Sequence, residues 1–255
     1  MSQLSTPQRQ RTRRTATQHA AMRRSNEHTI LAQLRSEPDL PGTLIARKTG
    51  LAPQTVSVLL RNLEGEGLIA RSRVLRGKRG QPAVPFHLKP DAAYAIGAEI
   101  GWQQMNIVLL DLAGNITRGP RISYRYPDPD KIVDQLVSGI EEMIGNVTPR
   151  NARIIGVSLT QPSGLGERSW VLGASKDECQ RLMALDLPGE LRSRTGLDVH
   201  VHNDGTSALW SEKAFGRKSA ENDYAYVYLA CFIGSALHVN GRVLTGEGAG
   251  AARIG

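Results

Sequence analysis

The sequence predicts an α/β protein of two units, an N-terminal winged helix-turn-helix and a C-terminal domain of strands and helices. Charge separates the units, because residues 1–90 contain 16 Lys and Arg against 5 Asp and Glu, whereas residues 91–255 contain 16 against 19. Hydrophobic periodicity changes near Tyr94, from helical to strand spacing. Such asymmetry is typical of a nucleic-acid-binding unit joined to another domain. We expect a disordered basic arm at residues 1–24, the winged helix-turn-helix at 25–89 and the second domain at 90–255.

The N-terminus and the cysteines indicate the cellular compartment. The sequence has no run of 18 apolar residues, so no membrane-spanning helix is expected, and its start lacks the apolar core of a secretory signal. The Arg-rich, acid-free start is interpreted as an arm that contacts phosphates without sequence preference, an organellar transit peptide being the alternative. Cys179 and Cys231 form no C-x-x-C pair, which fits a reducing compartment. We expect a cytoplasmic, nucleoid-associated protein.

Three apolar-periodic segments predict the helices of the N-terminal unit. The first, NEHTILAQLRS, follows Ser25 or Asn26 as its cap. The second runs from Thr43, its expected N-cap, to Gly50, its expected end. The third carries Pro53 at its first position, where proline is favoured. Its apolar residues fall at i, i+3, i+4 and i+7 and are Val56, Leu59, Leu60 and Leu63.

Two short helices joined by a tight turn are the helix-turn-helix pattern, whose second helix enters the major groove. The polar face of that helix suits base contacts, because Gln pairs with adenine and Ser or Thr with several bases. LIARSRVLRGKRGQPAVPFHL predicts two strands around a basic, Gly-rich wing suited to phosphates and the minor groove. The alternative is a plain three-helix bundle with a solvated polar face. The residues expected to contact double-stranded DNA are Thr43, Gln54, Thr55, Ser57, Arg61, Arg76, Lys78, Arg79 and Gln81.

Residues 23–88 resemble the winged helix of ROK-family transcriptional regulators, with RGQP at the wing and Gln81 where that family usually has Arg. The family also includes sugar kinases, and nearly all of residues 91–255 resembles its actin-like (ribonuclease H-like) domain. The resemblance implies a homodimer that binds a DNA operator and a sugar or sugar derivative, away from any membrane. The second lobe is expected to be incomplete, because the sequence reaches GEGAGAARIG before further helices. Its last strands are then expected to expose apolar surface.

The second domain contains recognisable strand and helix patterns. Strands are expected at YAIGAEIG, MNIVLLDLAGNI, RISYRY, RIIGVSLTQPSG and LDVHVHND. Helices are expected at residues 129–145, at ELRSRTG and at TSALWSEKAFG, the last with Thr206 as its cap. YAYVYLACFIGSALHVNGRVL is expected to form two strands closed by Asn240-Gly241, a strong hairpin signal.

The resemblance implies that kinases of this family hold ATP phosphates on two turns and use an Asp as the base. The first turn here contains Trp102 and Gln103 in place of a Gly-Gly-Thr type run, and the second contains Phe232 in place of Gly-Thr-Gly. We expect these side chains to fill the space that phosphate oxygens need. The protein is therefore not expected to be an enzyme, and no catalytic residue is assigned. Asp204 would be the base of an active kinase.

The sequence keeps Asn203-Asp204, the pair that the resemblance places at the sugar-binding part of the site. Both side chains can hydrogen-bond sugar hydroxyls without ATP, whereas the alternative is that Asp204 only caps the following helix. Arg253 stands where the family usually has a sugar-contacting Glu, and it suits an acidic or phosphorylated sugar. No cofactor or metal site is expected, since the family's Cys-rich zinc site is absent and His200 and His202 are interpreted as ordinary strand residues.

These expectations favour a sugar-responsive, DNA-binding transcriptional regulator, most simply a repressor of carbohydrate uptake or metabolism genes. Two alternatives stay open. One is a ROK-family sugar kinase that phosphorylates hexoses with ATP. The other is a DNA-binding protein whose second domain only dimerises.

Overall fold

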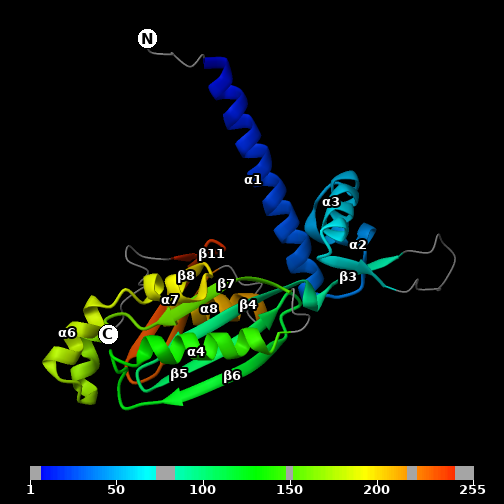
Figure 1. The fold of residues 1–255 in the computed structure, drawn as a ribbon. Coiled ribbons are helices and arrows are strands. Elements are labelled where there is room, and N and C mark those ends of the chain that lie inside the picture. Colours follow the sequence, from blue (N-terminus) through cyan, green and yellow to red (C-terminus); the bar gives the residue numbers. More distant parts are fainter. Residues whose placement is uncertain (1–6, 73–83, 148–151, 217–222, 245–255) are drawn as a thin grey trace, which may run out of the picture. The chain divides into compact units, whose positions relative to one another are not determined.

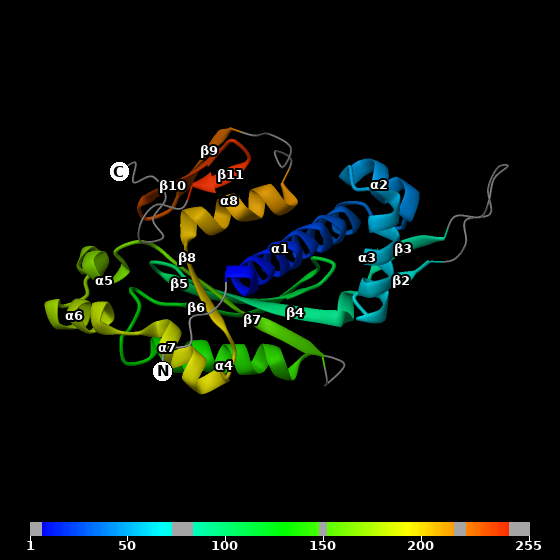
Figure 2. The same ribbon diagram turned by 90° about the horizontal axis from the view of Figure 1, so that it is seen from above.

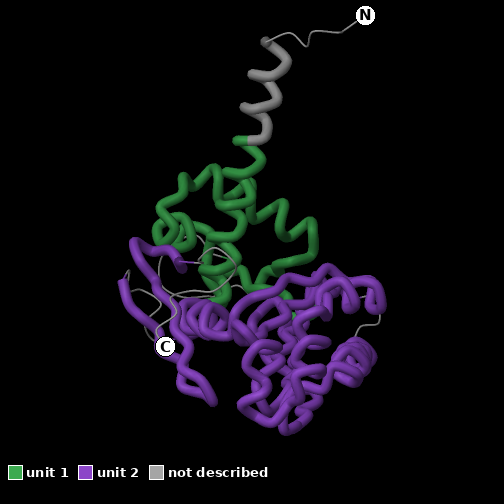
Figure 3. Tube along the Cα trace, turned by 90° about the vertical axis from the view of Figure 1, so that its left-hand side faces the viewer, with its two compact units in different colours: residues 1–92 green, residues 93–255 purple. Residues whose placement is uncertain are grey.

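The computed structural model describes residues 7–72, 84–147, 152–216 and 223–244, with side chains from residue 18 onward. The chain divides into two compact units, Met1–Ala92 and Ala93–Gly255 (Figure 3). The expected boundary at residue 90 lies beside this division. Among the described helices, none combines the length and the apolar character that a membrane crossing requires.

The first unit contains three helices and a small sheet. Its elements are α1 (Pro7–Ser36), β1 (Leu40–Pro41), α2 (Gly42–Thr49), α3 (Pro53–Gly65), β2 (Ile69–Arg71), β3 (Pro85–Leu88) and a 3-10 helix at Pro90–Ala92. Strand β3 lies between β1 and β2 and pairs antiparallel with both (Figure 1). The core joins Ile30 and Leu34 of α1 to Ile45 of α2 and to the predicted stripe of α3, all buried. The predicted winged helix-turn-helix is confirmed.

Helix α1 differs from the sequence prediction of a disordered arm at residues 1–24. The helix begins at Pro7 and is continuous to residue 36, so Ser25 and Asn26 lie inside it and do not cap it. The reason lies in composition, because no Gly or Pro follows Pro7 in this stretch and Arg, Gln and Ala are good helix formers. Proline itself is tolerated in the first turn.

The turn between α2 and α3 follows its sequence signals, but the start of α2 does not. Gly50 ends α2 in the left-handed region at φ 70°, and Pro53 occupies the first turn of α3. The N-cap of α2 is Pro41, not Thr43, and it makes no side-chain cap bond. Pairing of Pro41 with Pro85 of β3 holds the backbone extended up to Gly42, so the helix begins there.

The second unit is built on a five-stranded sheet in the order β6-β5-β4-β7-β8. Its strands are β4 (Ala93–Ile100), β5 (Gln104–Asp111), β6 (Ile116–Ser123), β7 (Arg153–Gln161) and β8 (Val199–Asn203). The first three form an antiparallel meander, and β7 and β8 run parallel to β4. Helices α4 (Ile132–Gly145) and α7 (Leu187–Thr195) cover one face, and α8 (Asp204–Phe215) covers the other (Figure 2). This is the expected α/β sheet domain.

Two features of this unit differ from the sequence prediction. Helices α5 (Leu165–Arg168) and α6 (Lys176–Ala184), with a 3-10 turn at Ser169–Leu172 between them, were not expected. The signal for α6 was present, since Ser175 and Glu178 form a capping box. Strand β6 ends at Ser123 and does not continue to residue 126. The Tyr124 hydroxyl turns inward instead and lies 2.9 Å from the carbonyl oxygen of Gly101.

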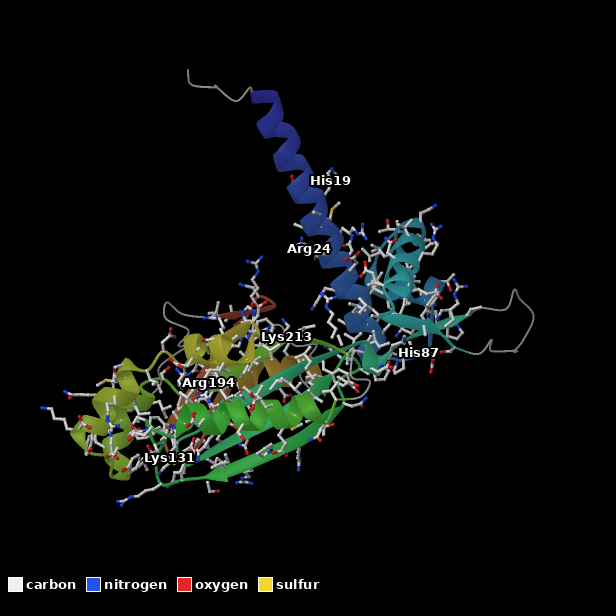
Figure 4. All side chains as sticks on the ribbon, in the orientation of Figure 1. His19, Arg24, His87, Lys131, Arg194 and Lys213 are labelled. Carbon is white, nitrogen blue, oxygen red and sulfur yellow. The ribbon has the colours of Figure 1, made fainter. Side chains whose placement is uncertain are left out.

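A separate three-stranded sheet packs on α8. Its strands are β9 (Tyr224–Leu229), β10 (Ile233–Val239) and β11 (Arg242–Leu244), in the order β11-β10-β9. The predicted hairpin turn is confirmed, with positive φ at both Asn240 and Gly241. The prediction of two strands was wrong, because a turn at residues 230–232 divides the first of them. Lys213 of α8, labelled in Figure 4, donates to the Gly241 carbonyl at 2.7 Å and so ties α8 to the hairpin.

The two faces of this small sheet differ in burial. One face packs on α8 around Leu209 and Ala236, both with 0% exposure. The expected exposed apolar surface lies on the other face, at Val227, Leu229, Ile233 and Leu244.

Candidate DNA-binding surface and carbohydrate site

Helix α3 separates apolar from polar side chains as the sequence predicts. Its apolar stripe is buried against α1 and α2, whereas Gln54, Ser57 and Arg61 are exposed and Thr55 is half-buried. The Arg61 Nε donates to the Ser57 carbonyl at 3.3 Å, one turn back on the same helix. The face of α3 that would meet base edges is therefore free of tertiary packing among the described residues.

A groove runs beside this face, with a volume of about 380 Å³. It brings Thr43 of α2 together with Ser57 and Arg61 of α3, but Gln54 and Thr55 do not line it. The remaining walls come from the apolar side of the helices and from the hairpin, at Pro41, Gly42, Pro53, Val56, Leu60, Arg71, Val84 and Phe86. Hydroxyl and guanidinium groups are among the lining side chains, and phosphate oxygens accept hydrogen bonds from such groups.

Arg71 is a groove residue that the sequence analysis missed. Its guanidinium donates to both carboxylate oxygens of Glu64, at 2.8 and 3.0 Å, and its Cζ lies 5.5 Å from the ring centre of Phe86. The hydrogen bonds from Arg71 lower the pKa of Glu64. The bidentate pair ties the end of α3 to strand β2 at the base of the wing. Its place in a run of five basic residues, RSRVLRGKR, was the available signal.

The wing strands pair as predicted, with Arg71 opposite Phe86 and Ile69 opposite Leu88. At their base, Ser72 Oγ lies 2.7 Å from His87 Nδ1 and also contacts the Asp39 carboxylate (Figure 4 labels His87). These contacts join the wing to the segment between α1 and β1. The predicted wing-tip residues lie outside the described residues and are Arg76, Lys78, Arg79 and Gln81.

Asn203 ends β8 and is the N-cap of α8, which corrects the prediction of Thr206. Its Oδ1 accepts from the backbone N–H of Thr206 at 3.3 Å, and its Nδ2 donates to Ser163 Oγ at 3.1 Å. Thr206 is 2% exposed and lies within the first turn, because the helix begins at Asp204. One side chain therefore links the ends of β7 and β8 to the helix that follows.

Asp204 is the first residue of α8 and is half-buried. Its Oδ1 accepts from the Gly205 N–H at 2.7 Å. Burial raises the pKa of Asp204, against the opposing effect of this hydrogen bond and of Asn203. Close packing favours glycine at position 205, since a Cβ there would lie 3.1 Å from the Ser235 carbonyl oxygen.

Further polar groups gather around this pair at the carboxyl ends of the parallel strands, where open α/β sheets bind ligands. The Oε1 of Gln161 is buried and has no hydrogen-bond partner among the described residues. Thr160 and Ser207 share a hydrogen bond of 2.9 Å. Burial raises the pKa of the Tyr228 hydroxyl, as do the nearby charges of Glu99 and then Asp204. Hydroxyls, an amide and carboxylates in one place can exchange hydrogen bonds with a polyol.

The two turns compared above with phosphate loops contact each other. The ring centroids of Trp102 and Phe232 are 4.4 Å apart at an interplanar angle of 54°, and Trp102 is 5% exposed. Cys231 Sγ donates to Gln103 Oε1 at 3.5 Å across the same two turns. Arg168 of α5 places its Cζ 5.4 Å from the centre of the Phe232 ring. Large side chains therefore pack between the turns.

The structure adds little about the two strand histidines and Arg253. His202 is half-buried on β8, and burial and then the neighbouring His200 lower its pKa. Within the described ranges, no three His, Cys, Asp or Glu residues come together to hold a metal ion. Arg253 lies outside the described residues.

Each of the two units matches a known protein family. The sequence matches the ROK family over residues 95–255 and the MarR family over residues 24–79. An uncharacterized protein of Sinorhizobium fredii is 23% identical over 204 residues, covering 78% of this chain and 50% of that protein. The xylose repressor of Bacillus subtilis is 21% identical over 225 residues, covering 88% of this chain and 58% of the repressor. The chain thus spans little more than half the length of the repressor.

A solved structure agrees in fold. The crystal structure of a ROK family transcriptional regulator, a homolog of the E. coli MLC protein, matches with a TM-score of 0.65 and 21% identity. The match covers 91% of this chain and 58% of that chain. It confirms the order of a helix-turn-helix unit followed by an actin-like sheet domain.

Proposed function

Because the chain belongs to the ROK family, we propose that it is a sugar-responsive, DNA-binding transcriptional regulator, most simply a repressor of carbohydrate genes, acting in the cytoplasm. The observation that carries the proposal is the presence of two different polar sites in one chain. One is the exposed face of α3 with its groove, and the other is the Asn203-Asp204 cluster at the ends of β7 and β8. The first suits DNA and the second suits sugar hydroxyls.

The relatives support this reading of both sites. The MarR-family match covers the helix-turn-helix. Proteins named xylose repressor match over most of this chain, which supports a monosaccharide as the ligand. In the proposed mechanism, a sugar changes DNA affinity because it binds one arrangement of the domains better than another.

Regulators that read palindromic operators do so as dimers, so we propose a homodimer whose two α3 helices meet half-sites one or more helical turns apart. Sedimentation velocity of the chain alone and with operator DNA tests this part. If the second domain only dimerised, calorimetry against a sugar panel would show no heat of binding while DNA binding persisted.

Sugar phosphorylation is the second candidate function, and the packing of Trp102 against Phe232 opposes it. The ring centroids are 4.4 Å apart, and the two rings come from the turns that occupy the positions of the kinases' phosphate loops. ATP phosphates need backbone N–H groups that side chains do not cover. A coupled assay with ATP and a hexose panel tests the point. We expect no turnover above background, and turnover that Asp204→Asn abolishes would establish a kinase instead.

The proposed function is tested by operator binding. Operator sequences are first selected from a random duplex library, and the affinity of the chain for the selected DNA is then compared with its affinity for random DNA. We expect a clear preference for the selected sequence. Equal affinity for both would leave only non-specific phosphate binding.

A further inference from the structure

Two turns from different sheets are joined by three side chains, which we call the aromatic clasp: Trp102, Arg168 and Phe232. Trp102 lies between β4 and β5 of the five-stranded sheet, and Phe232 lies between β9 and β10 of the small sheet. The centroids of their rings are 4.4 Å apart, and the Arg168 guanidinium lies over the Phe232 ring, with its Cζ 5.4 Å from the ring centre. Tilted aromatic pairs and a cation near a ring both attract.

The clasp joins the β9–β10 turn directly to the core of the five-stranded sheet. Trp102 belongs to the buried cluster of the five-stranded sheet, and Phe232 packs against that cluster. The rest of the small sheet packs on α8 through a different cluster, around Leu209 and Ala236. Phe232 therefore anchors the β9–β10 turn in the main core, next to the hydrogen bond from Cys231 to Gln103.

The anchored turn leads directly into the wall of the carbohydrate site. Gly234 follows Phe232 by two residues, and a Cβ built on Gly234 would lie 3.8 Å from Asp204 Oδ1. Tyr228 is the register partner of Gly234 on the neighbouring strand. Packing on α8 holds the body of the small sheet near Asp204, and the clasp holds the β9–β10 turn, beside which Gly234 and Tyr228 lie two and four residues from Phe232.

We propose that the aromatic clasp is a positioning device that fixes Gly234 and Tyr228 at the Asn203-Asp204 site, so that a monosaccharide binds without nucleotide. The sugar-binding part rests on the proposed function. Without the clasp, the β9–β10 turn and the strand ends beside it would adopt several positions relative to Asp204, although the rest of the small sheet stays packed on α8. The apparent sugar affinity would then fall in proportion to the population that keeps the binding arrangement.

The first test reports on the clasp itself and needs no ligand. The chain has three Trp residues, and Trp170 and Trp210 are 66% and 48% exposed. In a Trp170→Phe/Trp210→Phe background, Trp102 is the single tryptophan, and its emission, excited at a wavelength that tyrosine does not absorb, should resist acrylamide quenching. Phe232→Ala should increase its quenching several-fold, and Phe232→Tyr, which keeps the ring, should leave it unchanged. Phe232→Leu keeps apolar volume without a ring and replaces the Ala variant if that does not fold.

The second test is calorimetry of the native chain and the same Phe232 variants with D-xylose and D-glucose. Phe232→Ala should weaken binding about 10-fold, within the usual range of coupling between sites, and Phe232→Tyr should restore it. Unchanged quenching in Phe232→Ala overturns the clasp, whatever the sugars do. Increased quenching with unchanged sugar affinity overturns the positioning role. A native chain that binds no sugar contradicts the proposed function and the positioning role together, while the quenching result still stands for the clasp.

Discussion

The side-chain oxygen of Asn203 accepts a hydrogen bond from the backbone N–H of Thr206 at 3.3 Å, while the Asn203 amide donates to Ser163 at 3.1 Å. Asn203 is thus the cap of α8, and in the proposed function it is also a member of the carbohydrate site. These two roles make different demands on the residue. An acceptor oxygen is enough to cap a helix, whereas a sugar ligand also uses the N–H donors.

Substitutions at Asn203 separate the two roles. Asn203→Ala removes the cap and should lower the free energy of unfolding by about 1 kcal/mol. Asn203→Asp keeps a capping oxygen and removes the N–H donors, so it should unfold at a urea concentration close to that of the native chain and lose sugar affinity. Urea denaturation and sugar calorimetry on the two variants provide the check. Native sugar affinity in Asn203→Asp would show that the residue only caps.

Asp204 should make stability depend on pH. Burial raises its pKa, so the folded chain holds the carboxyl proton more tightly than the unfolded chain does. Ionisation at neutral pH therefore costs stability, and this cost disappears as the pH falls through the raised pKa toward the ordinary Asp value of about 4. Asp204→Asn should unfold at higher urea than the native chain at pH 7, with a gain that shrinks toward acid pH. A gain that grows on acidification would mean that the pKa is lowered.

Base reading should depend on Gln54. The side chain is exposed on the first turn of α3, and loss of a bidentate contact with a base costs about 1–3 kcal/mol. Gln54→Ala should weaken binding to selected operator DNA by that amount and leave binding to random DNA almost unchanged. Gln180→Ala, an exposed Gln on α6 of the other unit, is the matched control. Equal losses on both DNAs would exclude base reading by Gln54.

The wing should contribute charge without sequence preference. Lys78→Ala or Arg79→Ala removes one cation near the DNA backbone, and each lost phosphate contact reduces the slope of log affinity against log salt by about 1. Fluorescence anisotropy at several salt concentrations measures this slope. A salt slope equal to that of the native chain would place the wing tip away from the phosphates.

Elements could be predicted from the sequence where periodicity and turn residues agree with the tertiary packing. The i, i+3, i+4, i+7 stripe of α3, the Gly50 end of α2 and the Asn240-Gly241 hairpin are each determined by residues close in sequence. The start of α2 was mispredicted because it depends on the pairing of Pro41 with Pro85, which is distant in sequence. The cap of α8 was mispredicted because β8 ends at Asn203 and the helix begins at Asp204, a residue that the sequence analysis had placed in the strand.

The site was predictable in its residues but not in its geometry. Asn203 and Asp204 were found from the strand-to-helix junction, and Trp102 and Phe232 from their places in two turns. Their contact across 130 residues of sequence required the fold, as did the ion pair between Glu64 and Arg71. Side chains that meet from different sheets leave no periodic signal in the sequence.

The central claim is that a sugar bound at the Asn203-Asp204 site changes the affinity for operator DNA. The most direct measurement is an anisotropy titration of selected operator DNA with the native chain and with Asn203→Asp, each with and without D-xylose or D-glucose at saturation. We predict that one of these sugars weakens operator binding by the native chain at least about 5-fold, a typical coupling between sites. Asn203→Asp should bind operator equally well and not respond. Operator affinity that no sugar changes, or an equal response in both proteins, would contradict the account.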